Sequence, residues 1–185
     1  MIMVSIVSAS ISVHSASEIQ KLFEKIDVRG RAIHVTLPPP IGSVTGYHLF
    51  IVYTEKHGKQ FVCQGFPFDP ATGKIVSDEI LPSDPPGLLT KGQCIPFLPD
   101  NIDFIPDAPS ITVLSGPDAK LAYKCFFKVT DMFNGAKIPY HLVTGPNSNS
   151  YTRTMLDRCD ITAMKPAVAM LTPGWDISIN LDHKP

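Results

Sequence analysis

Four short polar residues at positions 147–150 are the strongest candidates for chemistry in this chain. They read Asn-Ser-Asn-Ser, follow the breaker pair at 145–146, and precede an apolar stripe that begins at Tyr151 and is typical of one face of a helix. Backbone N–H groups and the helix dipole favour developing negative charge at a helix start. Ser148, or Ser150 two positions later, could therefore be a nucleophile. The alternative is an ordinary N-cap, which all four residue types suit.

A histidine on an otherwise apolar predicted strand is the best candidate for a general base. His48 lies near the start of the β-rich run at 47–54, where a rigid strand would hold its imidazole in place. The alternative is a half-buried histidine bonded to a backbone carbonyl. His141, seven positions before Ser148, is the reserve candidate.

Two glutamines alternate with apolar residues on the next predicted strand. Gln60 and Gln64 share a face there, and a polar side chain beside a catalytic histidine can orient its ring. The alternative is that both glutamines simply face solvent, as alternate residues of a half-buried strand do. Asn147 or Asn149 would add a side-chain donor for an oxyanion.

Composition excludes several classes of protein. The chain has 185 residues, 44% of them hydrophobic, and 18 prolines, which predicts a globular domain with many connections. Its net charge of −1 without any like-charge run argues against a nucleic-acid partner. The interleaved serines of the apolar N-terminus fit neither a signal peptide nor a membrane span. We expect a cytoplasmic protein, or one secreted by a route that needs no signal peptide.

The cysteines show no metal-binding pattern. Cys63, Cys94, Cys125 and Cys159 are widely spaced and form no Cys/His ligand motif, so we expect no metal and no cofactor. Cys125 and Cys159 lie on apolar helix faces and are interpreted as buried thiols. The sequence leaves disulfide pairing open.

Periodicity and turn signals define the expected elements. Strands are predicted at 3–13, 32–37, 47–54, 60–65, 111–114 and 175–181. Helices are predicted after a capping box at Ser15, with an end at Gly30, after a cap at Ser115, with an end near Gly135, and after the 147–150 motif.

These elements predict an α+β fold, a small antiparallel sheet with a central hairpin packed against two main helices. We expect one domain over residues 1–185. It comprises a strand and short helix at 1–30, strands with His48 at 31–66, a long Pro-rich loop at 67–110, and at 111–185 the helices, the Ser148 motif and a last strand.

The order of these motifs resembles a known superfamily. A strand with His48, a polar strand at 60–64 and a helix start at 147–151 together resemble the circularly permuted papain-like fold, which includes NlpC-type cell-wall hydrolases and lecithin-retinol-acyltransferase-like enzymes. The 145–150 stretch also resembles a signature of bacterial domains, some of them secreted or toxin-associated. Ser148 stands where those families carry a nucleophilic cysteine.

The resemblance implies an amide or ester hydrolase or an acyl-transfer enzyme, in a bacterial effector or toxin context. Ser148 would attack, His48 would be the base, and Gln64 or Gln60 would orient the imidazole. The substrate would be a peptide, a peptidoglycan stem or a lipid ester. The alternative is a papain-like domain that has lost its chemistry and binds a protein partner.

Overall fold

A computed structural model describes residues 23–37, 42–77 and 86–182 of the chain. The expected strand at 3–13 and the capping box at Ser15 lie outside these residues.

The described residues form one antiparallel sheet and two helices. The strands are β1 (Lys25–Leu37), β2 (Gly42–Thr54), β3 (Gln60–Asp69), β4 (Lys74–Ile75), β5 (Leu89–Pro96) and β6 (Ser110–Ser115), and the helices are α2 (Pro117–Gly135) and α3 (Ser148–Arg158). The sheet has six strands in the order β4-β3-β2-β1-β6, with β5 paired to β3. The predicted α+β class, the antiparallel sheet and the hairpin at its centre are confirmed.

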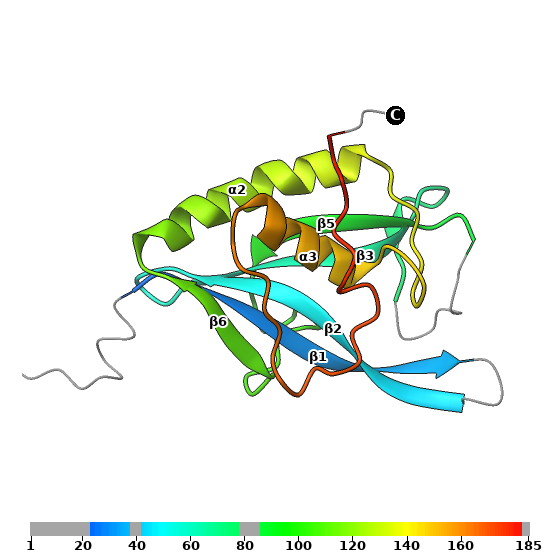
Figure 1. Cartoon of the computed structure of the whole chain (residues 1–185), viewed down its shortest axis with the longest axis horizontal. Helices are drawn as coiled ribbons and strands as arrows, with labels where there is room; N and C mark the ends of the chain where they lie inside the picture. The colour runs from blue at the N-terminus through cyan, green and yellow to red at the C-terminus, as the bar shows by residue number, and fades with distance from the viewer. Residues whose placement is uncertain (1–22, 38–41, 78–85, 183–185) are drawn as a thin grey trace, which may run out of the picture.

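Both helices lie on the same side of the sheet (Figure 1). Every second side chain of the central strands points toward the helices. Val28, Leu49 and Ile51 are among them, and all three are fully buried. Helix α2 contributes Phe126 and Phe133 to the same apolar cluster. Burial of this continuous apolar core is the main contribution to the free energy that holds the helices on the sheet.

The opposite face of the sheet has its own, smaller core. Phe50 and Val52 of β2 and Val62 of β3 pack there against Phe97, which belongs to the segment between β5 and β6. That segment also supplies Phe104, whose ring lies 5.0 Å from the Phe97 ring. The 97–109 segment therefore covers part of the sheet face that the helices leave open.

Four cysteines pair instead of forming buried thiols. Disulfides join Cys63 to Cys94 across β3 and β5, and Cys125 of α2 to Cys159 at the end of α3. The interpretation of Cys125 and Cys159 as thiols is thus wrong. Their apolar faces were correctly identified, but the packing of α2 against α3 brings them to bonding distance.

The structure also differs from the predicted elements in three places. The expected helix ending at Gly30 is strand from Lys25 onward, since antiparallel pairing with both β2 and β6 outweighs the local helical pattern. The Pro-rich stretch, expected to be mostly irregular with one or two brief strands, contains the eight-residue strand β5, paired with β3 from Phe61 to Phe68. Helix α2 is capped by Gly116, at φ 91°, and not by Ser115.

The predicted last strand at 175–181 is irregular chain. Its polar groups bond to α3 side chains instead of to a neighbouring strand. Ile179 N donates to Thr154 Oγ1 at 2.8 Å, and Ser150 Oγ donates to Gly174 O at the same distance.

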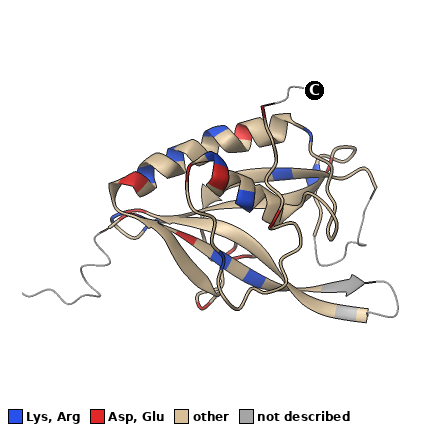
Figure 2. Ribbon diagram, in the orientation of Figure 1, with Lys and Arg blue, Asp and Glu red and all other residues tan. Residues whose placement is uncertain are grey.

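Charged residues are dispersed over the described part of the chain, with basic positions along α2 and within β1 (Figure 2). Neither α2 nor α3 is long and apolar enough to cross a bilayer, and the same holds for every helix among the described residues.

Candidate functional site

The start of α3 fills a gap where two strands separate. Pairing of β2 with β3 runs from Thr54↔Gln60 to Ile51↔Cys63 and then ends. Beyond this point, the side chain of Asn149 takes the place of a neighbouring strand. Its Oδ1 accepts from Leu49 N at 2.7 Å, and its Nδ2 donates to Tyr47 O at 2.9 Å. The two backbone groups on either side of His48 are therefore held by one side chain.

Asn147 is the N-cap of α3. Its Oδ1 accepts from the N–H groups of Asn149 and Ser150, and its Nδ2 donates to Leu142 O at 2.9 Å. Gly174, at φ 79°, lies so close that a Cβ there would collide with the Asn147 side chain. Asn147 is thus a framework residue, and it occupies two amides that an oxyanion would otherwise use.

Ser150 is also committed to the framework. It is fully buried, and its hydroxyl donates to Gly174 O. Asn147 and Ser150, both predicted as site residues, therefore tie α3 to the C-terminal segment. Ser148 differs, because no hydrogen bond joins its hydroxyl to another described residue, His48 included.

Ser148 lies against a glycine of β3. A Cβ added to Gly65 would stand 2.9 Å from Ser148 Cα and 2.8 Å from Tyr151 Cβ, so only glycine allows this approach. Ser148 itself is 5% exposed. Gly65 in turn lines a cavity of about 260 Å³. Ser148 is not among the residues that line this cavity, but its backbone lies directly against Gly65, which does line it.

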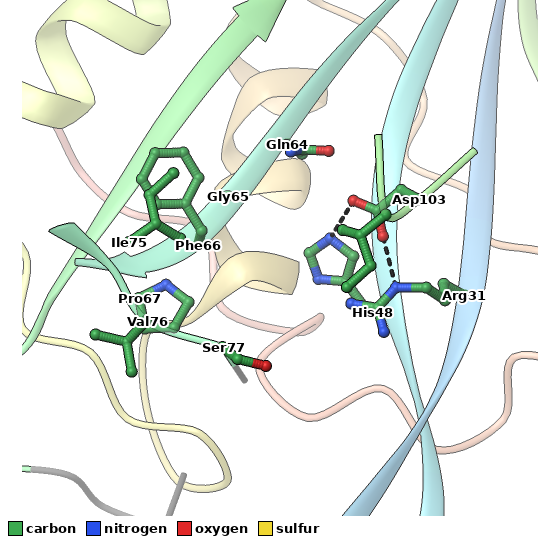
Figure 3. A pocket seen from close by; sticks show the side chains of 11 residues that line it. Arg31, His48, Gln64, Gly65, Phe66, Pro67, Ile75, Val76, Ser77 and Asp103 are labelled. Carbon is green, nitrogen blue, oxygen red and sulfur yellow. Dashed lines mark hydrogen bonds and ion pairs between the residues drawn. The ribbon is translucent and has the colours of Figure 1, made fainter. Parts of the chain in front are cut away.

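His48 opens into this cavity from β2 (Figure 3). It shares the face of Phe50, on which it stacks with ring centroids 5.9 Å apart. Its Nε2 lies 3.5 Å from Asp103 Oδ2, and the other carboxylate oxygen of Asp103 accepts from Arg31 Nε. The three side chains are all buried. A histidine held by a buried carboxylate is the arrangement that fixes the orientation of a general base.

The electrostatics of Asp103 fit this role. Burial by itself would raise its pKa, but His48 and Arg31 together lower it to about 2. The carboxylate is therefore ionised throughout the physiological range. It can stabilise a proton on His48 without taking that proton itself.

The two glutamines have different surroundings. Gln64 lines the cavity with His48, and its Oε1 is buried without a hydrogen-bond partner among the described residues. Gln60 donates through Nε2 to Thr54 Oγ1 at 3.1 Å and lines other cavities. The imidazole pairs with Asp103, a contact that neither glutamine prediction anticipated.

The cavity has one polar and one apolar side, as Figure 3 shows. His48, Asp103, Arg31 and Gln64 form the polar side. The apolar side is built from the end of β3, from β4 and from the residue after it, and it comprises Phe66, Pro67, Ile75 and Val76, whereas Ile102 lines the cavity next to Asp103 in the chain. The reserve base, His141, does not line the cavity, and its ring packs against Gly145. Within the described residues, no three His, Cys, Asp or Glu side chains converge as metal ligands.

Comparison with protein-family models, with curated proteins and with solved structures finds no match to this chain.

Asp103 and Arg31 are the site residues that sequence reasoning missed. Asp103 lies in the Pro-rich stretch between Ile102 and Phe104. An acidic residue flanked by large apolar ones is a weak signal that its side chain has a buried partner. Arg31 lies on β1 directly opposite His48, a register that only the observed pairing reveals.

Proposed function

We propose that this protein is a hydrolase or acyl-transfer enzyme of amide or ester bonds, with Ser148 as nucleophile, His48 as base and Asp103 as the residue that orients the base. The observation that carries the proposal is the buried His48–Asp103 pair, in a cavity whose Gly65 wall packs on Ser148. The resemblance of the motif order to permuted papain-like enzymes supports the same class, with Asp103 in place of the glutamine first expected.

Asn149 ties the segment that carries Ser148 to the strand that carries His48. Asn149 follows Ser148 in the chain and bonds to the backbone on both sides of His48. From standard bond lengths, the two Cα atoms lie within about 12 Å of each other. His48 lies on the sheet face of Phe50, so the mechanism requires the Ser148 hydroxyl to reach the imidazole past the end of the β2–β3 ladder.

In the proposed mechanism, Ser148 and His48 act in both halves of the reaction, the formation of an acyl-serine and its release. Ser148 Oγ attacks the carbonyl carbon while His48 accepts the hydroxyl proton through Nδ1, the nitrogen that does not face Asp103. The tetrahedral intermediate collapses, the leaving amine or alcohol takes that proton, and an acyl-serine remains. Water, or another acceptor, then releases the acyl group by the reverse sequence.

The oxyanion needs donors other than the amides of Asn149 and Ser150, because Asn147 already holds those. The Ser148 N–H and the side-chain amide of Gln64 are the donors proposed in their place. The apolar wall of the cavity fits a substrate with an aliphatic or aromatic group next to the scissile carbonyl. The two disulfides favour action in an oxidising compartment.

The second candidate is a domain that has lost the chemistry and binds a protein or peptide. The near-complete burial of Ser148, with no hydrogen bond to His48, favours it. The same cavity would then accept a side chain of the partner.

Turnover of small activated acyl compounds tests the proposal. We expect p-nitrophenyl esters of short fatty acids to be hydrolysed, and Ser148→Ala and His48→Ala each to lower kcat/KM by about 100-fold or more. His57→Ala, at an exposed position of the turn between β2 and β3, is the matched control and should have no effect. Equal activity in all four proteins would favour the binding domain.

A further inference from the structure

A second cavity on the same sheet face contains a cation whose charge is not balanced. Arg29 lies on β1, two residues before Arg31, and lines a cavity of about 220 Å³. Its side chain is only 15% exposed, yet its nearest carboxylate oxygen, Asp27 Oδ2, lies 3.8 Å away. Arg29 Nε is buried without a hydrogen-bond partner among the described residues. A guanidinium removed from water normally has close acceptors.

Asp27 forms no hydrogen bond with Arg29, and its charge is shared with a second cation. Its Oδ2 pairs with Lys25 Nζ at 2.8 Å, and its Oδ1 accepts from Thr112 Oγ1 at 2.7 Å. Two cations, Lys25 and Arg29, therefore share one carboxylate, which leaves a charge of 2 − 1 = +1. An anion at the cavity would neutralise it.

The other walls of this cavity are mostly apolar. Phe97 and Phe104 form one side, with the Arg29 guanidinium 6.0 Å from the Phe97 ring centre, and Ile105 and Pro106 form another. Gln60 is the one uncharged polar side chain among the described residues that line it. A neighbouring cavity of about 300 Å³ shares Gln60, Phe97 and Phe104 with it, so the occupant has room to extend.

We propose that the Arg29 cavity binds a small carboxylate carried on an aromatic or aliphatic body. The carboxylate would form a forked pair with the Arg29 guanidinium, and the body would pack against the two phenylalanine rings. A free hydrophobic acid or the terminal carboxylate of a peptide would supply this chemistry. The inference is independent of the hydrolase proposal, because neither Ser148 nor His48 lines this cavity.

Binding of benzoate and of its neutral isostere benzamide to the full chain tests the proposal by NMR. Benzoate should bind saturably, with a dissociation constant on the order of a millimolar, and should shift the Arg29 Nε–H resonance and the Phe97 and Phe104 ring signals. Benzamide should bind at least about tenfold more weakly, because it lacks the charge. Equal binding of the two compounds, or no shift at Arg29, would overturn the proposal.

Variants locate the site. Arg29→Gln should weaken benzoate by about tenfold or more, whereas Arg153→Gln, on α3, is the matched control and should not. If Arg29→Gln does not fold, the comparison of benzoate with benzamide binding to the natural chain still tests the proposal. His48→Ala should bind benzoate normally. Loss of binding in that variant would place benzoate in the His48 cavity and contradict the inference, without bearing on whether Ser148 is a nucleophile.

Discussion

The side chain of Asn149 bonds to both backbone groups that flank His48, the carbonyl of Tyr47 and the amide of Leu49. One amide group thus sets the position of the α3 start relative to the strand that carries the candidate base. Thr152 adds a third tie, since its hydroxyl donates to Leu49 O at 2.8 Å. Three hydrogen bonds thus join the helix start and the histidine strand into one unit.

Replacing Asn149 should separate this unit. Asn149→Ala leaves Leu49 N and Tyr47 O buried without partners, and we expect it to lower the free energy of unfolding by about 2–4 kcal/mol. Urea denaturation measures the change. Ser148→Ala, next to it in sequence, is the control and should change stability by less than about 1 kcal/mol, because the cap is Asn147. Equal losses in the two variants would contradict this assignment of roles.

Asp103 should make stability depend on acid pH. Its pKa in the folded protein is about 2, below the ordinary value of 3.8, so its contribution to stability is complete above pH 4 and is lost as the pH falls towards 2. The loss should be on the order of 2 kcal/mol. In Asp103→Asn this part of the pH dependence should disappear. The variant should also be less stable at pH 7 by about 3–5 kcal/mol, because the Arg31 charge stays buried without its partner.

Gly65 should tolerate no side chain. A methyl group there would press on Ser148 Cα and Tyr151 Cβ, both part of the α3 start, which its hydrogen bonds hold in place. Gly65→Ala should therefore destabilise the protein by about 1–3 kcal/mol and shift the amide resonances of residues 147–151. Gly58→Ala is a poor control because Gly58 has a positive φ. Ser77→Ala, at an exposed position of the same cavity, suits better and should leave these resonances in place.

The disulfides should each contribute substantially to stability. They close loops with sequence separations of 31 and 34 residues, for which chain entropy predicts about 3–4 kcal/mol per bond. Reduction, or the double replacement Cys125→Ser with Cys159→Ser, should lower the thermal midpoint, as scanning calorimetry would show. Four titratable thiols in protein purified under oxidising conditions would refute the pairing.

The sequence predicted correctly those elements whose conformation depends on residues close to one another in the chain. The hairpin turn, the α2 stripe and the 147–150 helix start each have signals within a few residues. The Lys25–Gly30 strand did not, because its β conformation depends on β2 and β6, which pair with it from distant parts of the sequence.

The site was predicted only in part, for a similar reason. His48 and Gln64 line one cavity, and Ser148 lies against Gly65, which also lines it. Asp103 reaches His48 only because the 97–109 segment folds over the open sheet face. Arg31 faces His48 only through the β1–β2 register. Such contacts depend on tertiary structure that spacing along the chain does not encode.

The most direct test of the central claim is the site at which a fluorophosphonate serine probe attaches, measured by peptide mass spectrometry. The account predicts one adduct on Ser148 in the natural chain, and none in Ser148→Ala or His48→Ala. The control His57→Ala should label as the natural chain does. An unlabelled Ser148 in the folded natural protein, or labelling of Ser148 that persists without His48, would contradict the account.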